Sequence, residues 1–135
     1  MGSFPSGTHV RVGLVIYGNL DIVTGGFLYD RMLVNYLRAR GDEVEVFARP
    51  WRHYASHVMD NGSLVWGRSL ADSQVDVLLQ DELNHPSLFL ANRRLRSRVT
   101  YPIVSIVHHL RCCEMRPAWQ NHLYRMVEQS YLSTV

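Results

Sequence analysis

The sequence predicts an α/β fold, a Rossmann-like three-layer sandwich in which a mostly parallel sheet lies between layers of helices. Short apolar runs rich in Val and Ile alternate with segments of helical period, as in right-handed crossovers between parallel strands. Several runs are almost continuously apolar, which is typical of strands covered on both faces. The 135 residues are 47% hydrophobic and 19% charged, the size and composition of one packed domain.

The first predicted unit is a strand, a glycine loop and a helix. Residues 10–17 (VRVGLVIY) form the predicted central strand, because they are nearly all apolar and β-branched. Turn residues predict a loop over 18–26, and a helix follows over 27–40 until Gly41 stops it. The apolar residues of this helix recur at helical spacing, at Tyr29, Leu33, Tyr36 and Leu37.

The rest of the chain repeats the alternation. Further strands are predicted over 44–47, 75–80 and 103–107, and further helices over 86–98 and from Pro117 to the end of the chain. Proline fits the first turn of a helix, where its missing N–H costs nothing. Residues 51–73 show no clear period, so we expect a loop with at most one helical turn. In the last helix, apolar residues recur every three or four positions, at Trp119, Leu123, Met126, Val127 and Tyr131.

Composition excludes several classes of protein. No apolar run approaches the roughly 18 residues of a transmembrane helix, and the polar residues 1–9 have no apolar signal core. We therefore expect a flexible tail over 1–9, a single domain over 10–135 and a cytoplasmic location. The adjacent cysteines Cys112 and Cys113 exclude a disulfide framework and a zinc ribbon.

The charged residues do not identify a binding partner. The net charge is +2, so no nucleic-acid partner is expected. All 14 basic residues are arginines, which a GC-rich genome would also produce. The polar face of the helix over 86–98 carries four of them, and it is either a solvated face or a contact for phosphate or an anionic membrane.

Polar groups follow three of the predicted strands directly. They are the glycine loop ending in Gly25 and Gly26, the cluster Asp81, Glu82, Asn84 and His85, and the pair His108 and His109. Since the carboxyl ends of parallel strands share one edge, where ligands bind, we expect these groups to converge.

Each group has a functional and a structural interpretation. The glycine pair can bring helix N–H groups close to a diphosphate, or it can simply form a turn. The carboxylates can act on a ligand or cap the next helix. The histidines can face a ligand or bond a loop carbonyl. A metal site built from His85, His108, His109 and Asp81 lacks a recognised ligand motif, so no metal is expected.

Four segments together resemble a known enzyme family. VRVGLVIYG, TGGFLYDRMLVNYLRARGDEVEVF, DVLLQDELNHPSL and YPIVSIVHHL are similar to the N-terminal half of GT-B glycosyltransferases of the GT4 type, the group 1 retaining enzymes. The resemblance runs from about Val10 to the end of the chain. In this family two Rossmann-like domains face each other across a cleft, and the first mainly holds the acceptor.

The resemblance implies a site and a chemistry. Gly25 and Gly26 match the glycine pair that approaches the diphosphate of the donor, and His108 matches the catalytic strand-end histidine that contacts the transferred sugar. On the acceptor side it places Asp81, Glu82, Asn84 and His109. The implied reaction is metal-independent transfer of a sugar, with retention, from a nucleotide diphosphate sugar to a sugar or lipid-linked acceptor. No other cofactor is implied, and a lipid-linked acceptor would place the protein at the inner face of the membrane.

The family's second domain, with its paired glutamates, has no counterpart in this sequence. The resemblance therefore implies that the chain is incomplete and inactive until a C-terminal domain or a second chain supplies the other half of the site. The alternative is a non-catalytic Rossmann-like binding or assembly module. Such a module would pair with a partner chain or a second copy through an exposed sheet edge.

Overall fold

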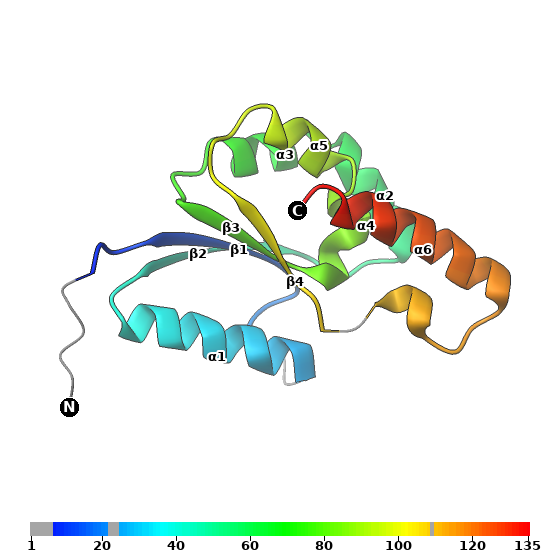
Figure 1. The fold of residues 1–135 in the computed structure, drawn as a ribbon, viewed down its shortest axis with the longest axis horizontal. Coiled ribbons are helices and arrows are strands. Elements are labelled where there is room, and N and C mark those ends of the chain that lie inside the picture. Colours follow the sequence, from blue (N-terminus) through cyan, green and yellow to red (C-terminus); the bar gives the residue numbers. More distant parts are fainter. Residues whose placement is uncertain (1–6, 22–24, 109) are drawn as a thin grey trace.

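The computed structural model describes residues 7–21, 25–108 and 110–135 and confirms the predicted fold class (Figure 1). Its strands are β1 (Arg11–Tyr17), β2 (Glu43–Arg49), β3 (Val77–Asp81) and β4 (Ile103–Ile106). They form a four-stranded sheet in the order β2-β1-β3-β4, and all three pairings are parallel. This is the doubly wound order in which ligands bind beyond the carboxyl ends of the strands.

Helices cover both faces of the sheet, as Figure 1 shows. One face is covered by α1 (Gly25–Ala39). The other carries α2 (Tyr54–Met59), α3 (Leu64–Ala71), α4 (His85–Leu88), α5 (Ala91–Arg96) and α6 (Ala118–Leu132). The described residues also form the short 3-10 turns η1 (Asp60–Gly62), η2 (Glu82–Asn84) and η3 (Arg111–Cys113). In the described part of the chain, no helix is both long and apolar enough to cross a bilayer.

Two apolar cores hold the layers together. Leu14 and Ile16 of β1 pack toward α1, where they meet Val34. Val15, between them in sequence, points to the other face and joins a core that includes Leu78 and Tyr131. This alternation on a strand buried from Val12 to Tyr17 confirms the prediction of a central strand.

The first helix differs from the prediction in its start and in its buried face. It begins at Gly25, so the glycine pair forms its first turn and does not lie in a loop ahead of it. Phe27, Asp30 and Val34 are buried, whereas Tyr29 is 50% exposed. The predicted stripe is therefore wrong in part, because the buried position at the site is a carboxylate, which an apolar period cannot reveal.

The prediction for residues 51–73 is wrong, since the segment contains α2, η1 and α3. These helices are too short to show a period. For α3 the sequence does contain a start signal, the N-cap residue Ser63. Its side chain accepts a hydrogen bond from the N–H of Trp66 at 3.2 Å.

The single helix predicted over 86–98 is interrupted between α4 and α5. The Asn61 side-chain oxygen accepts hydrogen bonds from the N–H groups of Leu90 and Ala91, both at 2.9 Å. These bonds satisfy donors at the start of α5 that no preceding turn satisfies. A cap supplied from about thirty residues upstream leaves no mark in the local sequence.

Candidate functional site

Three titratable side chains meet at the carboxyl edge of the sheet. Asp81 is the last residue of β3, His108 lies two positions after β4, and Asp30 projects from α1. His108 Nε2 lies 3.8 Å from Asp30 Oδ1. One ligand atom from each of the three residues lies within 4.8 Å of the other two. We call Asp30, Asp81 and His108 the rim cluster.

The two carboxylates of the rim cluster are buried, and their only basic partner among the described ion pairs is His108. Asp30 is fully buried and Asp81 is 2% exposed. Neither oxygen of Asp30 has a hydrogen-bond partner among the described residues, whereas Asp81 Oδ1 accepts the N–H of Leu83 at 2.9 Å. Burial, together with the adjacent Asp81, raises the pKa of Asp30 to about 8. The site therefore attracts a proton or another positive charge.

His108 opens the rim cluster to the surface. Its side chain is 29% exposed, and its ring packs edge-on against the Tyr29 ring, with centroids 5.0 Å apart. Tyr29 and Asp30 both belong to α1, which begins at Gly25. The structure thus brings the second turn of α1, which follows the turn with the glycine pair, beside the predicted catalytic histidine. His109, which was predicted to face the acceptor, lies outside the described residues.

Glu82 and Asn84 follow Asp81 in sequence but are enclosed by the protein. Asn84 is fully buried and donates to the backbone oxygens of Val15 and Asp81, both at 3.2 Å. Glu82 is 1% exposed, and its Oε1 lies 3.1 Å from His85 Nδ1. In this structure these two predicted acceptor-side residues support the site from within, and Asp81 lies closer to the open edge, beside His108.

Glu82 belongs to a second group of acids and histidine. His85 Nδ1 lies 3.9 Å from Glu128 of α6, and His85 Nε2 hydrogen-bonds the Tyr54 hydroxyl at 2.9 Å. Burial raises the pKa of Glu82. We call Glu82, His85 and Glu128 the inner cluster; all three are buried.

Glu128 ties the last helix to the segment after β4. Its carboxylate accepts the backbone N–H groups of Arg111 at 2.5 Å and Cys112 at 3.0 Å. The Arg111 guanidinium lies over the rings of Tyr54 and Tyr124, at 5.1 and 4.7 Å from their centroids. Burial alone would raise the pKa of Glu128, but the bonds from Cys112 lower it below its usual range. Glu82 Oε1 has no hydrogen-bond partner among the described residues. Both nitrogens of His85 and both oxygens of Glu128 have one, so the inner cluster is structural.

A third polar network lies beneath the same edge. Asp60 accepts hydrogen bonds from the side chains of Arg49, Arg52 and Ser87. The Ser87 hydroxyl also lies 2.5 Å from that of Tyr17. Burial opposes ionisation of Asp60, but these bonds lower its pKa. Sequence reasoning missed Asp30, Asp60 and Glu128, because no local pattern marks these carboxylates as buried.

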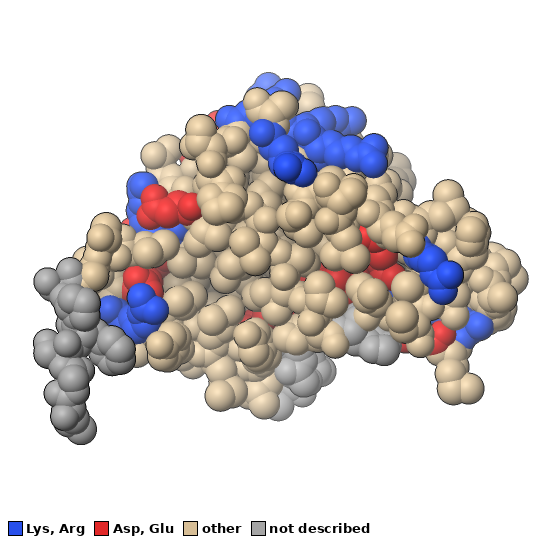
Figure 2. Space-filling view, in the orientation of Figure 1, with Lys and Arg blue, Asp and Glu red and all other residues tan. Residues whose placement is uncertain are grey.

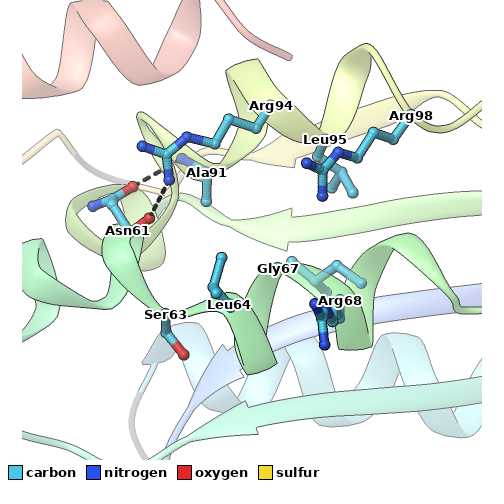
Figure 3. Close-up of a pocket in the computed structure, with 10 residues that line it drawn as sticks. Asn61, Ser63, Leu64, Gly67, Arg68, Ala91, Arg94, Leu95 and Arg98 are labelled. Carbon is cyan, nitrogen blue, oxygen red and sulfur yellow. Dashed lines mark hydrogen bonds between the residues drawn. The ribbon is translucent and has the colours of Figure 1, made fainter.

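The arginine-rich face lies away from the rim. Figure 2 shows basic side chains gathered over α3 and α5. Between these helices a pocket of about 130 Å³ is bordered by Arg68, Arg94 and Arg98 (Figure 3). Arg94 donates to the Asn61 backbone oxygen at 2.8 Å and so supports the start of α5. Since all three side chains are on exposed residues, the face fits the solvated interpretation.

Comparison with known proteins gives no relative: no family model, no curated protein and no solved structure matches the chain. Its function is therefore inferred from the fold and from the geometry of the rim.

Proposed function

We propose that the chain is the acceptor-side domain of a retaining glycosyltransferase, which transfers a sugar from a nucleotide diphosphate sugar to a sugar or lipid-linked acceptor. The observation that supports this most is the contact between α1 and the strand-end histidine, 3.8 Å from Asp30 to His108. This contact joins the second turn of α1, a helix that begins with two glycines, to an imidazole at the ligand-binding edge of a doubly wound sheet.

The two parts of this edge have complementary chemistry. The first N–H groups of an α-helix have no partner within the helix, and together with the helix dipole they favour an anion such as a diphosphate. Gly25 and Gly26 start α1 without side chains that would block a phosphate. His108 offers a partly exposed ring for the transferred sugar. Asp81 would face the acceptor, with Glu82 and Asn84 supporting it from behind.

Turnover requires positive groups that hold the departing diphosphate, and in this proposal a C-terminal domain or a second chain supplies them. The reaction would take place in the cytoplasm, at the inner face of the membrane when the acceptor is lipid-linked. In an enzyme with both halves, we expect His108→Ala to lower turnover about 100-fold, the usual scale for a positioned catalytic side chain.

Nuclear magnetic resonance tests the proposal on the chain itself. The ¹⁵N-labelled protein is titrated with UDP-glucose, GDP-mannose and UDP alone, and the shifted amides are mapped. We expect one of the nucleotides to shift amides at the start of α1 and beside His108, with weak affinity because half of the site is contributed by another domain.

His108→Ala and His122→Ala form a matched pair for this titration, because His122 is an exposed histidine on α6. The first change should remove the shifts beside residue 108, and the second should leave them intact. Shifts that map to the pocket between α3 and α5, or no shifts at millimolar nucleotide, would contradict the proposal.

A second candidate function is assembly, the non-catalytic alternative. It is favoured by exposed apolar side chains at the edge of the sheet: Val104 of β4 is 45% exposed and Val107 is 48% exposed. Trp119 and Leu123 on α6 are 65% and 52% exposed. A homodimer or a partner chain that adds a strand beside β4 would cover such an edge. Analytical ultracentrifugation of the wild type and of Val104→Lys separates the two candidates. A wild-type dimer that the substitution dissociates, in a chain that binds no nucleotide, would support assembly.

A further inference from the structure

Asp30 and Asp81 present an unusual balance of charge. Both are buried, and among the described ion pairs the only positive partner of Asp30 is His108, which carries charge only when protonated. The buried carboxylate of Asp60, by contrast, is compensated by Arg49 and Arg52. A buried ionised carboxylate is costly unless it is paired or coordinates a metal, so the rim cluster lacks a cation.

The three ligand atoms have a spacing that one ion can bridge. Two ligands bound to the same ion at about 2.1 Å lie about 3.0 Å apart when at right angles and about 4.2 Å apart when opposite. The observed 3.8 Å between His108 Nε2 and Asp30 Oδ1 falls between these limits. All three ligand atoms lie within 4.8 Å of one another, so a small contraction completes the site.

We propose that Asp30, Asp81 and His108 bind a divalent transition-metal ion at the carboxyl edge of the sheet. Two carboxylates and one imidazole suit ions such as Mn²⁺ and Zn²⁺. The three ligands come from α1, the end of β3 and the segment after β4, so the ion would fix the relative positions of these elements. The partly exposed His108 gives the ion a path from solvent and leaves positions for water or an anionic ligand.

The inner cluster has a similar set of residues but does not offer the same site. Both nitrogens of His85 are engaged, Nδ1 with the Glu82 backbone oxygen at 3.0 Å and Nε2 with the Tyr54 hydroxyl at 2.9 Å. Glu128 already accepts two backbone N–H groups. All three residues are buried, so an ion would have to break these bonds and would have no path of entry.

This inference does not depend on the proposed sugar transfer, and it adds to the metal-independent chemistry that the resemblance implies. The ion neutralises two buried carboxylates and holds the His108 ring through Nε2, which leaves Nδ1 for another ligand. No step of the transfer is assigned to it.

Binding of Mn²⁺ to the 135-residue chain tests the proposal, measured by isothermal titration calorimetry and by loss of the free-ion electron paramagnetic resonance signal. Mn²⁺ is the probe because carboxylates bind it well, whereas the thiols of Cys112 and Cys113 prefer softer ions. We expect one saturable site. Asp30→Asn and His108→Ala should each weaken it at least about 100-fold, since changes outside the ligand set already cost about 10- to 100-fold.

Asp42→Asn is the matched control, because Asp42 is a buried carboxylate bound to the N–H of Val10, before the start of β1. It should leave Mn²⁺ affinity unchanged. Glu82→Gln should also leave it unchanged, and loss of binding in this variant alone would place the ion in the inner cluster and overturn the proposal.

The proposal would also be overturned if the wild-type protein at pH 7 to 8.5 showed no saturable Mn²⁺ site with a dissociation constant below about 1 mM. A proton would then be the positive charge of the rim. His108→Ala keeps the test valid if Asp30→Asn fails to fold, because His108 is partly exposed and has no hydrogen bond among the described residues. Sugar transfer can fail while Mn²⁺ binds, and Mn²⁺ binding can fail while nucleotide shifts persist, so the two proposals are distinguishable.

Discussion

The rim cluster and the inner cluster start from adjacent residues, Asp81 and Glu82, and use the same chemical groups, two carboxylates and one histidine. They differ in how these groups are satisfied. In the inner cluster one carboxylate oxygen, Glu82 Oε1, has no hydrogen bond within the described part of the chain but lies 3.1 Å from His85 Nδ1, and the His85 nitrogens and Glu128 oxygens are bonded. The rim leaves both oxygens of Asp30 without a hydrogen bond among the described residues. Burial alone therefore does not mark a functional site, whereas burial combined with missing partners and an open edge does.

The inner cluster should respond most strongly to removal of its central carboxylate. Glu128→Ala deletes the acceptor for two backbone N–H groups, so we expect the free energy of unfolding to fall by about 3 kcal/mol. Urea unfolding followed by circular dichroism measures this. A loss below about 1 kcal/mol would mean that the inner cluster does not hold η3 to α6.

Removal of a carboxylate from the rim cluster should raise the free energy of unfolding instead of lowering it. The raised pKa of Asp30 means that the folded chain holds a proton that the unfolded chain releases, so stability decreases as pH rises from about 4 to about 8. Asp30→Asn removes this loss. In metal-free buffer at pH 8 we expect the variant to be more stable than wild type by up to about 5 kcal/mol.

The same comparison at pH 4 provides the control for this change, because both proteins then carry a neutral side chain at position 30 and should have similar stability. A variant that is less stable than wild type at pH 8 would show that the Asp30 carboxylate is satisfied in the folded chain.

These two clusters also show how much the sequence could predict. Strand composition and the order of elements predicted the parallel sheet, because a strand covered on both faces is apolar along its whole length. The edge position of Asp81 and His108 followed from the same rule. Asp30 could not be predicted, since its burial depends on α1 packing against a sheet formed by residues far along the chain. Glu128 was hidden because its partners are backbone N–H groups of another segment.

A smaller effect is expected at the border of the inner cluster. Tyr54→Phe removes the hydroxyl that bonds His85 Nε2 at 2.9 Å but keeps the ring that packs under Arg111. We expect a loss of about 1 kcal/mol, the usual net value of one neutral hydrogen bond. Chemical unfolding of the variant beside wild type measures it, and an unchanged midpoint would remove Tyr54 from the structural network.

The smallest effect on stability should come from His108. Its side chain is 29% exposed and contacts Tyr29 through its ring edge. In metal-free buffer His108→Ala should change the free energy of unfolding by less than about 0.5 kcal/mol, as at most surface positions. Thermal unfolding checks this, and a loss above about 2 kcal/mol would make His108 a structural residue like His85.

The most direct test of the contrast between the clusters is the titration of Asp30 itself. The side-chain carboxyl carbon of Asp30 can be followed by ¹³C nuclear magnetic resonance in the metal-free chain from pH 3 to pH 10. Our account predicts a midpoint near the pKa of about 8 that burial and Asp81 impose. A midpoint near the ordinary value of 3.8 would show a satisfied carboxylate and would contradict the assignment of the rim as the functional site.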